Sequence, residues 1–218
     1  MEKSKHMSFE DYSKKISETI RRMNLIAITG VSGIGKSTFV QLLVKNSTFP
    51  ISVICADDFL KRSYCGTNGF RNNTKDILCP EMFNWGLLNG VINSLRAGQL
   101  VIIPHYSHGY GWTDTNTIFP ADIIIVDGLF LDSECCNSII DFDLIITMEC
   151  SKELLYQLRM KRDNYHRQNA DSFSRTVEET EAEIESCIIS NESYKRTASS
   201  NNVKRLLIDD NLFINELS

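Results

Sequence analysis

The chain has 218 residues, of which 42% are hydrophobic and 23% are charged, and its formal net charge is −5. This length fits one domain with a buried core and room for a small insert, and the composition is ordinary for a globular protein. Because nucleic-acid-binding surfaces usually carry a basic excess, the acidic balance argues against a nucleic-acid partner.

Helices and strands are expected to alternate along the chain. Short, nearly continuous apolar runs predict strands, and apolar residues spaced three and four apart predict helices. Ser8, Ser151 and the capping box Thr176–Glu179 mark helix starts, and Pro80 suits a first helical turn. In chain order we expect a helix at 9–23, a strand at 25–29, a helix at 36–45, a strand at 51–56, a long loop at 61–79, a helix at 80–96, strands at 100–103, 122–126 and 144–148, helices at 151–167 and 176–196, and a strand at 203–208.

One segment matches a phosphate-binding pattern at every fixed position. The residues from Gly30 to Ser37 read G-V-S-G-I-G-K-S, which fits G-x-x-x-x-G-K-[ST], between an expected strand and an expected helix. The glycines let the loop close around an anion with its N–H groups pointing inward, and the helix start adds the positive end of its dipole. Lys36 is expected to neutralise phosphate charge, and the Ser37 hydroxyl is expected to ligate Mg²⁺.

This motif, together with apolar strands that alternate with helices, predicts an α/β P-loop NTPase fold. We expect a five-stranded parallel sheet covered by helices on both faces, because buried parallel strands read as continuous apolar runs. With the strands at 25–29, 51–56, 122–126, 144–148 and 203–208 numbered one to five, the expected strand order is 2-3-1-4-5.

Two carboxylates follow expected strands. Asp127 ends the run 122–126, where such folds hold Mg²⁺ or its water shell, so we assign it to the metal. Asp57 follows the strand 51–56 and is expected to face the incoming phosphate, where it would take the proton from an attacking hydroxyl. Either aspartate is also compatible with an ordinary turn at the end of a strand.

A GTPase or molecular switch is the main alternative from another class. A switch needs N-K-x-D after a later strand, but the segment Asn73–Asp76 has these residues in another order within an expected loop. It also needs D-x-x-G at the second acidic strand, where position 130 is Phe130. Both observations favour a kinase, and a nucleotide-binding protein without transferase activity stays open as a third hypothesis.

A basic helix supplies the expected lid. Arg159, Arg162 and His166 fall on one helical face. Arginines that fold over a γ-phosphate contribute to phosphoryl transfer, and a lid excludes the water that competes as acceptor. A solvated helix face is the alternative explanation of these charges.

Other features bear on location and partners. The seven cysteines contain no C-x-x-C pair, which argues against structural zinc and favours free thiols in a reducing cytosol. The first ten residues lack the apolar segment of a signal peptide, and no apolar run is long enough to span a bilayer. We therefore expect a cytoplasmic protein with a small-molecule substrate and no membrane partner, and the sequence leaves a homo-oligomer open.

Taken together, these residues resemble the uridine kinase–phosphoribulokinase–pantothenate kinase group over about residues 25–209. The resemblance lies in the glycine loop, in the segment Cys55–Phe59 whose Asp57 takes the place of the expected base, and in the P-x-Y segment that ends at Tyr106. Asp127–Gly128 stands where the group usually has E-G. Arg159-x-x-Arg162-Asp163-x-x-x-Arg167 resembles the lid motif, with Gln168 where a glycine is common.

The acceptor is less clear than the reaction, because the set of residues that reads the pyrimidine in uridine kinases is not kept here. Instead, Tyr106, His108, Tyr110 and Trp112 stand at every second position and would share one face of an extended segment. They are compatible either with stacking on a planar or sugar ring or with a packed loop. Uridine, cytidine, nicotinamide riboside, pantothenate and simple sugars all stay open as acceptors.

The resulting hypothesis is an ATP- and Mg²⁺-dependent kinase. Residues 1–24 would form an N-terminal amphipathic helix, and residues 25–218 the kinase domain with a substrate-binding insert at 60–120 and a lid at 151–175. The expected catalytic residues are Lys36, Asp57, Arg159 and Arg162, and the metal ligands are Ser37 and Asp127. The nucleotide-binding residues are Gly30, Val31, Ser32, Gly33, Ile34, Gly35, Lys36, Ser37, Thr38 and Arg167, and the acceptor-binding residues are Asp57, Phe59, Tyr106, His108 and Arg162.

Overall fold

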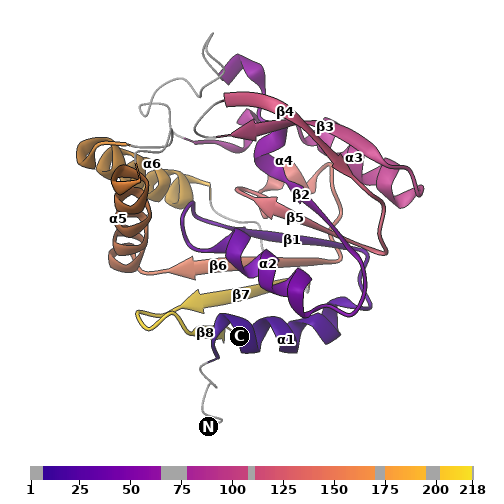
Figure 1. Ribbon diagram of the computed structural model, residues 1–218, viewed down its shortest axis with the longest axis horizontal. Helices are drawn as coiled ribbons and strands as arrows, with labels where there is room; N and C mark the ends of the chain where they lie inside the picture. The colour runs from indigo at the N-terminus through magenta and orange to yellow at the C-terminus, as the bar shows by residue number, and fades with distance from the viewer. Residues whose placement is uncertain (1–6, 65–77, 108–110, 170–174, 195–201, 218) are drawn as a thin grey trace.

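The computed structural model describes residues 7–64, 78–107, 111–169, 175–194 and 202–217 (Figure 1). Its α-helices are α1 (Phe9–Ile20), α2 (Lys36–Asn46), α3 (Trp85–Arg96), α4 (Glu134–Asn137), α5 (Lys152–Gln168) and α6 (Val177–Ser193), and its 3₁₀-helices are η1 (Ala56–Phe59), η2 (Arg62–Tyr64) and η3 (Pro80–Met82). Its strands are β1 (Leu25–Gly30), β2 (Ile51–Cys55), β3 (Val101–Ser107), β4 (Gly111–Ile118), β5 (Ile123–Gly128), β6 (Leu144–Cys150), β7 (Val203–Ile208) and β8 (Ile214–Leu217).

The main sheet has the order β2-β5-β1-β6-β7-β8. Its first five strands are parallel and confirm the predicted order 2-3-1-4-5. The prediction of five strands was wrong by one, because β8 returns antiparallel to β7 and adds a sixth strand. This strand has only four residues, Ile-Asn-Glu-Leu, which is too short for a periodic signal.

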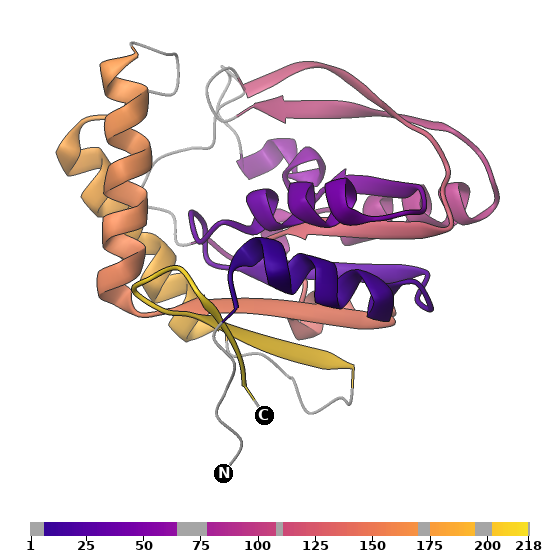
Figure 2. The same cartoon turned by 60° about the horizontal axis from the view of Figure 1, so that its bottom comes forward.

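Each face of the sheet has its own core. On one face, Ile26 and Ile28 of β1 pack with the buried side chains of α1 and α2. On the other face, Leu25 and Ala27 of the same strand pack with α3 and the β3–β4 hairpin. The two layers of helices lie on opposite sides of the sheet, and α5 and α6 stand together at its carboxyl end (Figures 1 and 2).

The predicted helix at 80–96 is in fact two elements, η3 and α3. Phe83 between them is extended, because neighbouring backbone groups are engaged by the segment after β2. The Asn84 N–H donates to the Phe59 carbonyl at 2.8 Å, and the Lys61 N–H donates to the Met82 carbonyl at 2.8 Å. The Asn84 side chain then caps α3 by accepting from the N–H of Leu87.

The expected strand at 100–103 extends to Ser107 and forms a hairpin with β4. The prediction that 106–112 is one extended segment was wrong, because the chain reverses and Ser107 pairs with Gly111. Tyr106 lies directly opposite Trp112, and their rings meet edge to face with centroids 5.3 Å apart. The other two predicted ring residues, His108 and Tyr110, lie outside the described residues.

The helix caps agree with the sequence. The Ser8 hydroxyl accepts from the N–H of Asp11, and Ser151 caps α5 in the same way. Thr176 and Glu179 form the predicted capping box at α6. Within the described part of the chain, no helix combines the length and apolar character needed to cross a membrane.

Candidate active site

The phosphate loop connects β1 to α2 at the carboxyl edge of the sheet. Gly33 and Gly35 have φ values of 91° and 102°, in the left-handed region that favours glycine. At Gly33 a side chain is also excluded sterically, because a Cβ would lie 2.2 Å from Cδ of Arg159. The loop is therefore shaped by its own glycines and covered by the stem of an arginine from α5.

Lys36 points back into this loop, where its Nζ donates to the Val31 carbonyl at 3.1 Å. Burial lowers the pKa of Lys36, and the carboxylates of Asp127 and Asp57 act in the opposite direction. A bound polyphosphate would favour the charged ammonium further, because an opposite charge within a few ångströms raises an amine pKa. The Lys36 ammonium thus lies inside the loop, where it can pair with an anionic ligand.

Ser37 and Asp127 form the strongest candidate for a metal site. The Ser37 hydroxyl donates to Oδ2 of Asp127 at 2.7 Å. Oδ1 of Asp127 is buried and has no hydrogen-bond partner among the described residues. Burial raises the pKa of Asp127, while Lys36 and the Ser37 hydrogen bond oppose that shift.

These two side chains fit magnesium. Mg²⁺ in phosphate-binding proteins is held by one or two protein oxygens together with phosphates and waters, so a larger protein cage is not needed. The described residues contain no group of three or more His, Cys, Asp or Glu side chains suited to a metal. An unpartnered carboxylate oxygen beside a serine hydroxyl is the donor set that this arrangement offers.

Asp57 lies beside this site because β2 and β5 are neighbours in the sheet. Cys55 at the end of β2 pairs with Asp127 of β5, and η1 follows at once with Asp57 in its first turn. A Cβ at position 128 would lie 2.3 Å from Cβ of Ala56. The two strand ends can therefore approach this closely only because residue 128 is glycine.

A cavity of about 1170 Å³ runs across the edge of the sheet and is lined by Lys36, Ser37, Asp57 and Asp127. On the α3 side, its wall comes from side chains of the core that includes the hairpin. These are Leu60, Leu78, Phe83, Tyr106 and Leu129. On the α1 side, it is lined by Phe9 at the start of α1, Leu158 of α5 and Leu212 of the turn between β7 and β8.

The beginning of α1 and the β7–β8 turn are joined directly. Met7 and Ile214 exchange two backbone hydrogen bonds, of 3.3 and 2.7 Å. In both ribbon views, the yellow β7–β8 segment lies against the indigo start of α1 (Figures 1 and 2). Phe9 also reaches the phosphate loop, since its ring lies 3.5 Å from the position of a Cβ on Gly35.

The arginines of α5 lie in three different environments. Arg159 is 1% exposed, and its Nη1 donates to the Ser32 hydroxyl at 2.7 Å, with Glu183 of α6 at 3.9 Å. Arg162 lines the cavity, and its Nε donates to Asp163 at 2.9 Å. Arg167 donates instead to the carbonyls of Arg175 and Thr176 and to the Thr180 hydroxyl, so it joins α5 to the start of α6.

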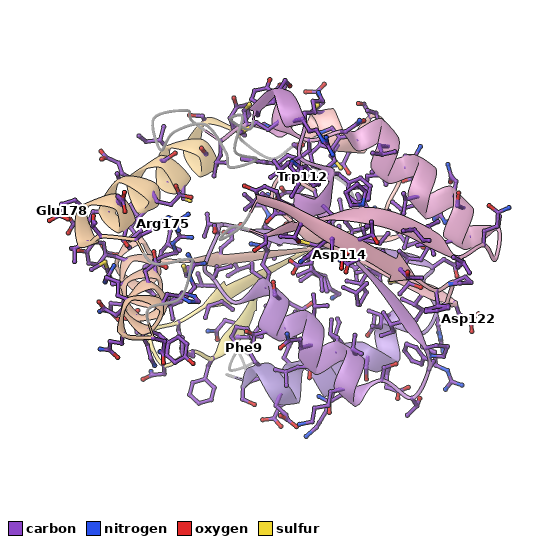
Figure 3. All side chains as sticks on the ribbon, turned by 45° about the horizontal axis from the view of Figure 1, so that its top comes forward. Phe9, Trp112, Asp114, Asp122, Arg175 and Glu178 are labelled. Carbon is purple, nitrogen blue, oxygen red and sulfur yellow. The ribbon has the colours of Figure 1, made fainter. Side chains whose placement is uncertain are left out.

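Asp163 joins α5 to α6. It is fully buried between the two helices and accepts from the Thr180 hydroxyl at 3.0 Å. Burial raises the pKa of Asp163, but Arg162, Arg159 and the Thr180 hydrogen bond together outweigh that effect, so the pKa lies below its ordinary value. Arg175, 3.7 Å from the same carboxylate, also lines the cavity and is labelled beside α5 and α6 in Figure 3.

The structure therefore brings together most of the residues predicted for the site. Ser32, Gly33, Ile34, Gly35, Lys36, Ser37, Thr38, Asp57, Tyr106, Asp127 and Arg162 line the large cavity. Gly30 and Val31 line a smaller pocket next to it, and Arg159 covers the loop from outside the cavity.

Two predicted residues lie elsewhere, and one cannot be placed. Phe59 is 2% exposed and belongs to the core behind η1, and Arg167 lies at the α5–α6 junction, so neither lines the cavity. His108 is outside the described residues. Phe9 and Arg175 line the cavity but were not predicted from the sequence, because Phe9 belongs to an amphipathic helical pattern and Arg175 stands in no motif.

Comparison with known proteins agrees with this geometry. The family model described as "Phosphoribulokinase / Uridine kinase family" matches residues 25–197. The chain is 34% identical to a uridine kinase of Schizosaccharomyces pombe over 72% of this chain and 36% of that protein, and 30% identical to a phosphoribulokinase of Synechocystis over 65% of this chain and 42% of that protein. It thus spans well under half the length of these two relatives.

A solved structure of D-glycerate 3-kinase from Cryptococcus neoformans var. grubii superposes with a TM-score of 0.65 at 11% identity, and the match covers 96% of each chain. At this identity the likeness concerns the fold alone. The matched family model covers most of the chain, including the phosphate loop, Asp57, Asp127 and the arginines of α5. This chain therefore belongs to the phosphoribulokinase/uridine kinase family.

Proposed function

We propose that the protein transfers the γ-phosphate of ATP to a hydroxyl group of a nucleoside-like small metabolite and that it needs Mg²⁺ to do so. The observation that carries this proposal is that Lys36, Ser37, Asp57 and Asp127 line one cavity. Phosphoryl transfer to a hydroxyl requires a phosphate-binding loop, side chains that bind a metal ion, and a carboxylate near the transferred phosphate.

Each side chain has a role that follows from its place. The loop N–H groups and Lys36 hold the β- and γ-phosphates. Ser37 and Asp127 would hold Mg²⁺, which when bound neutralises charge on the phosphate oxygens. Asp57 accepts the proton of the acceptor hydroxyl as its oxygen attacks phosphorus, and Arg162 meets the charge that spreads over the transferring group.

The two ends of the cavity suggest how the substrates are oriented. Asp57 and Tyr106 lie on the side of α3 and the hairpin, so the acceptor would enter there. The base of the nucleotide would then lie at the other end, between Phe9, Leu158 and Leu212. Such an apolar slot suits a planar base, because an aromatic ring and aliphatic side chains can cover its two faces.

The acceptor wall supports a nucleoside-like acceptor. Leu60, Leu78, Phe83 and Leu129 are apolar, and the ring of Tyr106 stands among them. This surface suits a ring with an apolar face better than a small charged polyol, which would need several polar partners. Relatives are named uridine kinase and phosphoribulokinase, and one structural neighbour is named D-glycerate 3-kinase, so nicotinamide riboside, pantothenate and sugars belong in the test as competing acceptors.

The test is a panel assay with Mg–ATP. Wild-type protein is incubated with nucleosides, vitamins and sugars, and ADP release is followed together with mass detection of the phosphorylated product. We expect one nucleoside-like acceptor to give product. We also expect Lys36→Ala to abolish transfer, and Asp57→Asn to lower kcat by about 10²- to 10⁴-fold while ATP affinity is kept.

Two results would overturn the proposal in different ways. ATP binding without phosphorylation of any acceptor would favour a nucleotide-binding protein that lacks transferase activity. Near-normal turnover of Asp57→Asn on the true acceptor would remove Asp57 from the role of base.

A further inference from the structure

Two adjacent aspartates in η1 have opposite surroundings. Asp57 lines the cavity, whereas Asp58 is 3% exposed and belongs to the wall behind it. Oδ1 of Asp58 accepts from the N–H of Tyr106 at 2.7 Å, in a fully buried hydrogen bond that joins η1 to β3. A single carboxylate therefore connects the turn that carries the proposed base to the strand that carries Tyr106 of the acceptor wall.

The same carboxylate is engaged by a second group of the hairpin. Nδ1 of His105 lies 3.1 Å from Oδ1 of Asp58, and the His105 ring is 43% exposed on its outer side. The Asn116 side-chain amide of β4 lies 3.1 Å from the same Nδ1 of His105. Burial raises the pKa of Asp58, and these three partners, Tyr106, His105 and Asn116, oppose that shift.

The hairpin is locally irregular at this contact. Pro104 pairs with Thr115 and Tyr106 pairs with Trp112, so two residues of β4 lie opposite the single residue His105. Such a bulge changes the twist of a strand and the direction of its side chains, and bulges occur often beside active sites. Here the bulge lies opposite His105, whose side chain contacts Asp58. The next residue is Tyr106, whose N–H donates to Asp58.

We propose that Asp58 is a positioning residue, which together with His105 fixes the distance between the proton-accepting carboxylate of Asp57 and the acceptor pocket at Tyr106. This inference rests on the proposed function of the site. Asp58 is joined to Asp57 by one peptide bond, and η1 is closed by the Leu60 N–H donating to the Asp57 carbonyl at 3.2 Å. Movement of Asp58 relative to β3 is therefore also movement of Asp57 relative to Tyr106.

The chemistry explains why a carboxylate is needed at position 58. A carboxylate has about four acceptor sites and no donor, so it can accept from a backbone N–H, an imidazole and an amide at once. The N–H of Tyr106 and Nδ1 of His105 both contact Oδ1 of Asp58. In Asp58→Asn the amide oxygen can keep both contacts but carries no charge, and hydrogen bonds to a charged acceptor are about twice as strong as neutral ones. The connection between η1 and β3 should then loosen without the loss of a packed side chain.

The experiment compares Asp58→Asn with Asp114→Asn, a control at an exposed bulge residue of β4 (Figure 3). The Asp114 carboxylate accepts from the N–H of Thr115 at 2.8 Å, and the amide oxygen of asparagine can accept the same bond. A displacement of about 1 Å at a reacting group can cost about 10²-fold in rate. We expect Asp58→Asn to lower kcat/KM for the acceptor by about 10- to 100-fold, on the same scale. The dissociation constant for Mg–ATP should change less than about twofold, because no phosphate-binding group contacts Asp58 in the described residues.

Hydrogen–deuterium exchange at the Tyr106 amide gives a readout that does not depend on catalysis. We expect this amide to exchange faster in Asp58→Asn than in the wild-type protein, and to exchange at the wild-type rate in Asp114→Asn. His105→Ala should reproduce part of the Asp58→Asn effect. His105→Gln keeps a hydrogen-bond donor and should therefore behave like the wild-type protein. If Asp58→Asn does not fold, the two His105 variants carry the same test.

Several outcomes would overturn the inference. Unchanged Tyr106 exchange together with unchanged acceptor kinetics in Asp58→Asn would show that the contact positions nothing. Equal losses of ATP affinity and acceptor kinetics would show a general structural role instead. If the wild-type chain phosphorylates no acceptor, the proposed function fails, whereas the exchange difference between Asp58→Asn and Asp114→Asn still decides whether Asp58 holds β3 to η1.

Discussion

Gly128→Ala tests whether the approach of two strand ends builds the site. Gly128 follows Asp127 at the end of β5, and Ala56 precedes Asp57 in η1. Gly128 is not among the residues with positive φ, so alanine is allowed there by the backbone and only the added methyl group matters. The substitution therefore isolates a steric effect between the segments that carry the two aspartates.

The size of the effect follows from one distance. The new Cβ would lie 2.3 Å from Cβ of Ala56. Carbon atoms in ordinary contact are about 3.5–4.0 Å apart, so the strand ends must separate by more than about 1 Å. Overpacking of this kind costs about 1–3 kcal/mol. For a chain of this size, we expect Tm to fall by about 4–8 °C for a loss of about 2 kcal/mol.

We expect a large loss of kcat in addition to the fall in Tm, because both aspartates move with the strand ends. We expect kcat to fall by about 10²-fold, in line with the cost of a displacement of about 1 Å at a reacting group. The assay combines thermal unfolding with steady-state kinetics on the acceptor found in the panel. The double variant Ala56→Gly/Gly128→Ala removes the facing methyl group and should recover most of both losses. Normal kcat in Gly128→Ala, or a double variant no better than the single one, would refute the reasoning.

Three further variants test the Phe9 end of the cavity and the arginines of α5. Phe9→Ala should weaken ATP binding by about 5- to 10-fold, because stacking of an aromatic ring on a base contributes about 1–3 kcal/mol. The same variant should bind tripolyphosphate, which has no base, as the wild-type protein does, and calorimetry measures both affinities. Equal weakening of both ligands would place the base elsewhere. Arg162→Gln should lower kcat by about 10²-fold or more, whereas Arg167→Gln should lower Tm and leave kcat within about threefold, because Arg167 contacts the α6 start. Loss of ATP affinity in Arg167→Gln without a change in Tm would restore the expectation that Arg167 binds nucleotide.

The sequence predicts the phosphate side of the site well, because that side is built from local chain geometry. Eight consecutive residues, from the last residue of β1 to the second residue of α2, form the motif, so the pattern from Gly30 to Ser37 contains nearly all the information needed. The strand order was expected from the P-loop fold that this motif indicates, and the parallel part of the main sheet has that order. Asp57 and Asp127 were placed correctly at the carboxyl edge, because both directly follow apolar strands and such strand ends meet at one edge.

Prediction failed where contacts distant in sequence override local preference. The expected helix is interrupted at Phe83 by two backbone hydrogen bonds, from the Asn84 N–H to the Phe59 carbonyl and from the Lys61 N–H to the Met82 carbonyl. Phe59 itself follows Asp57 by two residues, but the tight turn of η1 directs its side chain into the core. Arg167 continues the helical row of basic residues, yet it is captured by the start of α6, which no spacing rule within α5 can indicate.

The same distinction separates the reaction from the substrate. Backbone N–H groups hold phosphates regardless of side chains, so a loop of this form keeps its ligand while the rest of the chain varies. The acceptor wall is instead assembled from segments that are distant in sequence, such as Leu60 after η1 and Tyr106 on the hairpin. Their relative position depends on side-chain contacts, and the buried hydrogen bond from the Tyr106 N–H to Asp58 is one that joins η1 to β3 directly. A search for what determines the acceptor should therefore vary residues at the contact between η1 and β3 before it varies the phosphate loop.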